Sequence, residues 1–144
     1  MSPNYVKKIR KMTRDDIPYV RKLWAKSSID LTLSDDSIEL EKMISQNEEF
    51  CLVCEIDTII ISAVLGGFDG RRGWVHHLAV DPNYRRQQIG TFMMEKLMEK
   101  FIKADVVKVK LEILKSNIEV VEFYKQLNWD LRSDLVTMSY SLRK

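Results

Sequence analysis

The sequence lacks both a long hydrophobic run and a strong net charge. Nowhere in the 144-residue chain do about 18 apolar residues follow one another, the length that a membrane-spanning helix requires. The N-terminal segment MSPNYVKKIRKM has charges but no apolar stretch of signal-peptide length. The 23 Lys and Arg residues nearly balance the 21 Asp and Glu residues, which leaves no overall attraction to nucleic acid. We therefore expect a cytoplasmic protein with no membrane partner and no nucleic-acid partner.

Cysteine is scarce as well. The 2 cysteines, Cys51 and Cys54, stand in the apolar segment FCLVCEI. On a strand, three residues span roughly 10 Å, which is too far for a disulfide without distortion. A zinc site would need a second pair of ligands, and a redox pair would open a helix. The sequence therefore predicts two buried core cysteines and no metal site.

The chain also has no internal repeat, low-complexity tract or linker. With 45% hydrophobic residues it can bury one substantial core, so we expect a single domain over residues 1–144. Hydrophobic periodicity and turn residues predict a mixed α/β sheet flanked by helices. Strands are expected at residues 5–12, 50–56, 59–67, 74–80, 106–114, 129–132 and 136–142, and helices from residue 13, over 34–45, from 89 and over 117–126.

The stretch VDPNYRRQQIGTFMMEKLMEK, residues 80–100, joins an expected strand to an expected helix. A helix start leaves backbone N–H groups without partners, and the helix dipole favours an anion there. Arg85 and Arg86 add two guanidinium groups, and Gly90 lets a ligand approach the backbone. A pyrophosphate site is one interpretation, and a solvated polar loop is the other. The helix that follows has an apolar face made of Ile89, Phe92, Met93, Leu97 and Phe101.

A second group of candidates could carry acid–base chemistry. Tyr124 lies two helical turns after Asn117 and is either a proton donor or a half-buried core residue. Glu112 is either a general base or a solvent-side, ion-paired carboxylate. His76 and His77 are neighbours on a strand, so their side chains should point to opposite faces and cannot chelate one metal. Either imidazole is an alternative base, and the parity of the strand does not say which.

With these residues assembled, two segments resemble the GNAT family of N-acetyltransferases. LAVDPNYRRQQIG is similar to the family's pyrophosphate motif, with Arg85 at its first position and Gly90 at its last. Gln88 stands where a glycine is usual. NIEVVEFYKQLNW resembles the family's pattern of Asn, helix, Phe or Leu with Tyr, and Gly-Phe, with Asn117 and Tyr124 in register. The segment LEILKSN also resembles ribosomal-protein N-terminal-alanine acetyltransferases, and GGFDGRRG onward resembles YpeA-type bacterial acetyltransferases.

The resemblance implies transfer of acetyl from acetyl-CoA directly to a primary amine, without a metal. It implies a mostly antiparallel mixed sheet in which the strands at 74–80 and 106–114 form a splayed central parallel pair. Glu112, His76 or His77 would be the base, and Tyr124 would protonate the leaving thiolate. The cofactor-binding residues would be Leu78, Ala79, Val80, Arg85, Arg86, Gln87, Gln88, Ile89, Gly90, Thr91 and Asn117.

Four questions stay open at this point. A non-catalytic acyl-CoA-binding module of the same fold is an alternative, which Gln88 at the usual glycine position favours. Nucleic-acid binding would rest on Arg71, Arg72, Arg85 and Arg86, without an aromatic stacking platform. The acceptor is a small-molecule amine or a peptide N-terminus, and the protein is a monomer or a homodimer.

Overall fold

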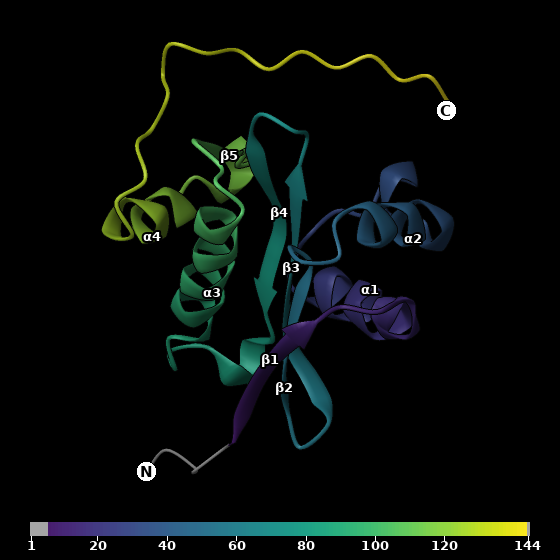
Figure 1. Cartoon of the computed structure of the whole chain (residues 1–144). Coiled ribbons are helices and arrows are strands. Elements are labelled where there is room, and N and C mark those ends of the chain that lie inside the picture. The colour runs from purple at the N-terminus through teal and green to yellow at the C-terminus, as the bar shows by residue number, and fades with distance from the viewer. Residues whose placement is uncertain (1–5, 144) are drawn as a thin grey trace. The chain divides into compact units, whose positions relative to one another are not determined.

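The computed structural model describes residues 6–143, and the chain divides between Leu111 and Glu112 into two compact units. The first unit contains a five-stranded sheet in the order β1-β2-β3-β4-β5 (Figure 1). Its strands are β1 (Lys7–Lys11), β2 (Leu52–Ile56), β3 (Ile59–Phe68), β4 (Gly73–Val80) and β5 (Val109–Leu111). Neighbouring strands from β1 to β4 are antiparallel, and β5 is parallel to β4. The mixed, mostly antiparallel sheet is thus confirmed, although residue 5 of the expected first strand lies outside the described residues.

Two helices, α1 (Ile17–Lys26) and α2 (Ser37–Gln46), cover one face of this sheet, and α3 (Ile89–Lys103) covers the other (Figure 1). One face of α1 is apolar and buried, and it consists of Ile17, Val20, Leu23 and Trp24. They join residues of β2, β3 and β4 in the main hydrophobic core, which consists of Met12, Ile17, Val20, Leu23, Trp24, Leu40, Ile44, Cys51, Val53, Ala63, Leu65 and Ala79.

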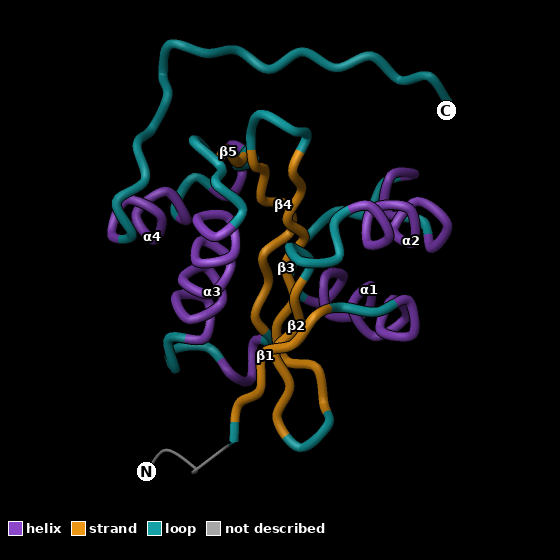
Figure 2. The backbone as a smooth tube through the Cα atoms, viewed as in Figure 1, coloured by secondary structure: helices purple, strands orange, loops and turns teal. Residues whose placement is uncertain are grey.

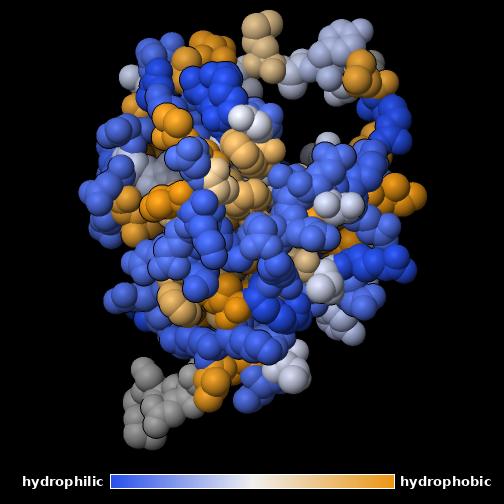
Figure 3. Space-filling model, in the orientation of Figure 1, coloured by the Kyte–Doolittle hydropathy of each residue, from blue (hydrophilic) through white to orange (hydrophobic). Residues whose placement is uncertain are grey.

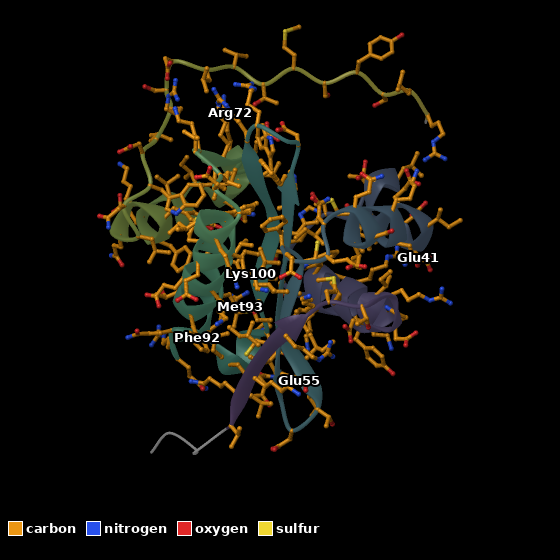
Figure 4. The ribbon with its side chains drawn as sticks, in the orientation of Figure 1. Glu41, Glu55, Arg72, Phe92, Met93 and Lys100 are labelled. Atoms are coloured by element: carbon orange, nitrogen blue, oxygen red, sulfur yellow. The ribbon has the colours of Figure 1, made fainter. Side chains whose placement is uncertain are left out.

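Helix α3 buries most of the apolar face that its sequence predicts. Ile89, Met93, Leu97 and Phe101 are at most 2% exposed, whereas Phe92 is 45% exposed. Figure 4 labels Phe92 and Met93, the neighbouring residues that differ in this way. Phe92 is therefore a surface residue near the start of α3, which corrects its expected place in the core.

Both cysteines are buried and free, as expected from their place in an apolar strand. Burial raises the pKa of the Cys51 thiol to about 11 and also raises the pKa of Cys54. Among the described residues, no group of His, Cys, Asp and Glu side chains is arranged to hold a metal ion.

Strands β2 and β3 form the predicted hairpin. Asp57 and Thr58 connect them, and both residues have positive φ, at 49° and 68°. Two consecutive residues with positive φ are typical of a tight turn whose twist matches that of the flanking strands. The turn forms although Asp-Thr is not a strong turn pair.

Strand β4 contains a bulge at His77. Ala63 pairs with Ala79 and Leu65 pairs with His76, so His77 and Leu78 together oppose one residue of β3. His77 has a φ of 55°, in the left-handed region that β-strand residues rarely adopt. The bulge breaks the strict alternation of side chains along β4, so the expectation that His76 and His77 point to opposite faces on parity alone is wrong.

Strand β5 is shorter than expected. It pairs only with the segment Gly73 to Val75 of β4 and ends at Leu111, although the alternating pattern extends over residues 106–114. Beyond Val75, the described residues give β4 a ladder partner on the β3 side only. The parallel pair is therefore brief, and the second half of β4 has a free backbone edge.

The second unit, residues 112–143, contains a short 3-10 turn, η4 (Lys115–Asn117), and helix α4 (Val120–Gln126). The strands expected at residues 129–132 and 136–142 do not form, and Figure 2 draws this part of the chain as loop. A strand needs a hydrogen-bonded neighbour, and in the described structure neither segment has one. Val136, Met138, Tyr140 and Leu142 alternate as a strand would, but each is at least 88% exposed.

Within the described part of the chain, no helix is both long and apolar enough to cross a membrane. The face in Figure 3 shows hydrophilic side chains around smaller, separated hydrophobic patches.

Candidate functional site: an anion cradle beside a bulged strand

The segment between β4 and α3 forms a cradle of backbone N–H groups, which we define as residues 85–91. It follows a 3-10 turn, η3 (Pro82–Tyr84), that is capped by Asp81, whose Oδ1 accepts a hydrogen bond from the Asn83 N–H at 2.9 Å. Arg86 and Gln88 both adopt the left-handed conformation, with φ of 65° and 59°. Gln88 is the N-cap of α3, where its carbonyl accepts the Phe92 N–H at 3.0 Å.

These conformations bear on the substitution of Gln for the usual glycine. A left-handed residue costs about 1 kcal/mol when it has a side chain, and glycine avoids that penalty. Gln88 adopts the conformation all the same, so α3 begins at Ile89 with its first amides free of intrahelical partners. The backbone shape that an anion requires is present despite the substitution.

A cavity of about 270 Å³ lies at the start of α3, between this helix and β1. Gln87, Gln88 and Thr91 of the cradle line it together with the exposed Phe92. Lys7 of β1 contributes a further cation, which sequence reasoning missed. No pattern links Lys7 to the cradle, because only the sheet order brings an N-terminal strand close to α3.

The cradle is rich in positive charge. Arg85 and Arg86 are exposed, and Arg85 Nε lies 3.5 Å from the carbonyl oxygen of Val80. Guanidinium groups bind phosphate oxygens in a bidentate way, and the N-terminal dipole of α3 adds to their attraction for an anion. The opening residues of this 15-residue helix therefore suit a phosphate or pyrophosphate group.

The second half of β4 leads directly into the cradle. Ala79 is buried in the core, and its carbonyl accepts a 2.7 Å hydrogen bond from the buried Ser62 hydroxyl. Leu78 and Val80 are half-buried. The free edge of this half-strand offers backbone groups that an extended ligand can pair with, as a further strand would.

The two neighbouring histidines occupy different surroundings. His76 is exposed and stacks on Trp74, with ring centroids 6.3 Å apart. His77 is half-buried; its Nε2 lies 2.9 Å from Oδ1 of Asp35, and its ring meets that of Trp24 edge-on at 5.0 Å. Asp35 ends η2 (Leu33–Asp35) in the connection between α1 and α2. The structure thus brings His77 together with this connection within the first unit.

The remaining predicted residues lie in the second unit. Glu112 is exposed, directly after the end of β5, and accepts a 2.8 Å hydrogen bond from the Thr137 hydroxyl. Asn117 ends η4, so the expected continuous helix from Asn117 to Tyr124 is interrupted, and α4 begins only at Val120. The Tyr124 ring packs edge-on against Phe123, at a centroid distance of 4.9 Å, and burial raises the pKa of its phenol to about 12.

Residues 11–129 match the Acetyltransferase (GNAT) family. Acetyltransferase ECA0875 of Pectobacterium atrosepticum is 28% identical over 134 residues, which cover 93% of this chain and 94% of that protein.

Two solved structures share the fold. Ard1 from Thermoplasma volcanium superposes with a TM-score of 0.80 at 19% identity, over 88% of this chain and 84% of that one. The PaiA N-acetyltransferase of Thermoplasma acidophilum, solved in complex with coenzyme A, gives a TM-score of 0.75 at 14% identity, over 85% and 88% of the two chains. With the sheet, the cradle and a family match that covers most of its length, the chain belongs to the acetyltransferase (GNAT) family.

Proposed function

We propose that the protein is an N-acetyltransferase that uses acetyl-CoA and transfers the acetyl group directly to a primary amine, either a small amine or a peptide N-terminus. The observation that carries this proposal is the cradle, where Arg86 and Gln88 are left-handed and the first residues of α3 line a cavity. We further propose that both compact units belong to one domain, because the family match spans their boundary at residues 111 and 112.

Each part of the site has a role in this reaction. The amides of residues 87–91, with Arg85 and Arg86, hold the pyrophosphate of the cofactor. Backbone groups of residues 78–80 bind the extended arm and the thioester, and an N–H aimed at the thioester oxygen stabilises the negative charge that forms there during attack. Asn117 contributes to cofactor binding from the second unit.

Proton transfer needs a base for the acceptor ammonium and an acid for the thiolate. Glu112, His76 and His77 are the candidate bases, since a carboxylate or a neutral imidazole has a lone pair that can accept a proton. Tyr124 is the candidate acid. Because burial raises the pKa of its phenol to about 12, Tyr124 keeps its proton at neutral pH and has one to donate.

The alternative function is a binding module that holds acyl-CoA without turnover. Gln88 at the usual glycine position favours this alternative, since its side chain narrows the approach to the backbone. Its left-handed conformation is compatible with both functions, since both need a cradle that binds the cofactor.

Calorimetric titration with acetyl-CoA and with CoA tests the cradle directly. We expect micromolar binding of both, and at least about tenfold weaker binding for the variants Arg85→Ala and Arg86→Ala, since a charge-assisted hydrogen bond contributes about 1.5–3 kcal/mol. Arg71→Ala is the matched control, because Arg71 is an exposed arginine in the loop between β3 and β4. Absence of binding at millimolar cofactor would overturn the proposal.

Turnover separates the enzyme from the binding module. A panel of primary amines and peptides with free N-termini should yield at least one acetylated product, detected by mass spectrometry together with free thiol release. Tyr124→Phe should then lower kcat while the affinity for acetyl-CoA persists. The same is expected of whichever variant among Glu112→Gln, His76→Gln and His77→Gln removes the base. Cofactor binding with no product from any amine would support the binding module instead.

A further inference from the structure

The carboxylate of Asp35 makes three hydrogen-bond contacts, with two residues. Its Oδ1 faces Nε2 of His77 at 2.9 Å, and its Oδ2 accepts the Thr32 N–H at 3.0 Å and the Thr32 hydroxyl at 3.4 Å. The Asp35 side chain is 7% exposed, whereas that of His77 is 28% exposed. A nearly buried carboxylate thus reaches from the α1–α2 connection to an imidazole that is still open to solvent on one side.

This contact determines which nitrogen of His77 carries the proton. An ionised carboxylate only accepts hydrogen bonds, and the three groups around Asp35 act as its donors. Nε2 of His77 must therefore carry a hydrogen, which leaves the lone pair of Nδ1 free in the neutral ring. A hydrogen bond at one ring nitrogen sets the chemistry of the other.

The backbone conformation at His77 also supports the contact with Asp35. A non-glycine residue with a φ of 55° within a strand is uncommon, and such conformations cluster at functional sites. Bulges of this kind redirect a side chain, and this one directs His77 to Trp24 of α1 and Asp35 of η2. Trp24, which the His77 ring contacts, has a buried indole N–H with no partner among the described residues.

We propose that Asp35 is a positioning residue, which fixes His77 in the tautomer whose Nδ1 is free, and that His77 is the base that accepts a proton from the acceptor ammonium. The inference rests on the proposed acetyltransferase function and selects His77 among its three candidate bases. The Asp35–His77 pair sits next to residues 78–80, where the thioester is proposed to bind, so the base and the electrophile are adjacent along β4.

The proton and bond changes balance. The acceptor ammonium gives one proton to Nδ1 of His77, and the free amine attacks the thioester carbonyl carbon to form a C–N bond. When the C–S bond breaks, Tyr124 or water protonates the thiolate, and the second proton that the nitrogen loses replaces the proton given by Tyr124 or water. The products are an amide and CoA thiol, and one proton passes from His77 to solvent. Asp35 stays ionised and stabilises the imidazolium while it exists.

Nitrogen NMR of the imidazole rings tests the tautomer without any acceptor. The chain has only 2 histidines, so the His76→Gln and His77→Gln variants assign both signals in the uniformly ¹⁵N-labelled full-length protein. We expect the neutral form of His77 to show a protonated Nε2 and an unprotonated Nδ1. In Asp35→Asn that preference should be lost, because an amide can either accept from or donate to Nε2. A protonated Nδ1 in the wild-type protein, or an unchanged tautomer in Asp35→Asn, would overturn the inference.

Kinetics with an acceptor from the amine panel distinguish positioning from a merely structural contact. General bases contribute about 10²–10⁴ to rate, so His77→Gln should lose about a hundredfold or more in kcat and Asp35→Asn about tenfold or more, with KM for acetyl-CoA unchanged. Asp36→Asn is the matched control, since it removes the same charge from an exposed neighbour. Equal kcat for Asp35→Asn and the control would refute the positioning role.

The two proposals fail in distinguishable ways. Cofactor binding or all acetylation could be absent while the NMR shows the predicted tautomer. The proposed function would then be wrong, and so would the role of His77 as a base, while the Asp35–His77 contact would be purely structural. If acetylation proceeds and His77→Gln keeps its kcat, the enzyme stands and His77 is not its base.

Discussion

Asp81 joins Lys26 of α1 to the start of the cradle: its Oδ2 lies 2.5 Å from Lys26 Nζ, while its Oδ1 caps the Asn83 N–H at 2.9 Å. Asp81 is 4% exposed, yet its pKa is lowered, because hydrogen bonds from Lys26 and Asn83 outweigh the effect of burial, which would raise it. One carboxylate therefore contacts α1 and caps η3, the turn that precedes the cradle.

We expect Asp81→Ala to weaken acetyl-CoA binding as well as folding. Loss of the cap and the ion pair should lower the free energy of unfolding by about 1–3 kcal/mol, measured by chemical denaturation. Lys26→Met is the informative control, because it removes the ion pair and keeps the cap. If the cap shapes the cradle, calorimetry will show weaker binding for Asp81→Ala and wild-type affinity for Lys26→Met. Equal affinities for all three proteins would contradict that role.

The left-handed conformation of Gln88 makes a second prediction. Gln88→Val should lower the free energy of unfolding by about 1 kcal/mol, because a β-branched residue is especially unfavourable there. Gln88→Gly should be more stable than Gln88→Val by at least that amount. The glycine variant should also bind acetyl-CoA more tightly than the wild type, because the backbone becomes more accessible. Thermal melts and calorimetry give both values. Weaker binding by the glycine variant would show instead that the Gln88 side chain contacts the cofactor.

The buried cysteines should be inert in the native protein. Burial raises the pKa of Cys51 to about 11 and also raises the pKa of Cys54, so few thiolates exist at pH 8. Burial also keeps a thiol reagent in solution from reaching either sulfur atom. We expect an aromatic disulfide reagent to titrate no thiol at pH 8 in buffer and both thiols in guanidinium. Fast release of one equivalent from the folded protein would mean that β2 opens locally.

The dependence of folding stability on acidic pH should involve Arg10. Its guanidinium donates to both oxygens of Asp16, at 2.8 and 2.9 Å, and Thr13 donates to the same carboxylate. Burial alone would raise the pKa of Asp16, but the hydrogen bonds from Arg10 and Thr13 lower it below 3.8. A lowered folded-state pKa stabilises the protein above the unfolded pKa, and that contribution is lost as the pH falls through the folded one.

Arg10→Met should therefore cost about 1–3 kcal/mol at pH 7, because it leaves a nearly buried carboxylate without its cation. The difference from the wild type should shrink below about pH 4, where Asp16 becomes protonated in the unfolded chain. Lys8→Met, at an exposed position of the same strand, is the control and should be nearly neutral. Denaturation curves at several pH values measure the effect, and a constant difference down to pH 2 would contradict it.

Local periodicity predicted most of the first unit correctly. The apolar faces of α1 and α3, the β2–β3 hairpin and the strand before the cradle all follow from the spacing of apolar residues. The cradle was also predictable, because Arg85, Arg86 and Gly90 stand next to one another at a strand-to-helix junction. These features depend on residues that are close in the sequence.

The parts that sequence reasoning missed depend on distant residues. The bulge at His77 has no glycine or proline to mark it, and Asp35 meets His77 across 42 positions of the chain. Val136, Met138, Tyr140 and Leu142 have the period of a strand, but pairing needs a neighbour that the pattern cannot supply. Lys7 reached the cavity beside the cradle only through the order of the sheet.

The bulge in β4 also governs how the strand tolerates change. Because two residues oppose one at this point, the period-two pattern of inward and outward positions changes phase between His76 and Ala79. Single-residue deletions at the bulge and outside it should therefore have different effects on the strand. A deletion of His77 restores an unbroken ladder and keeps both halves of β4 in register with β3. A deletion of Val75 instead shifts Gly73 and Trp74 by one position, so that their side chains face the opposite sides of the sheet.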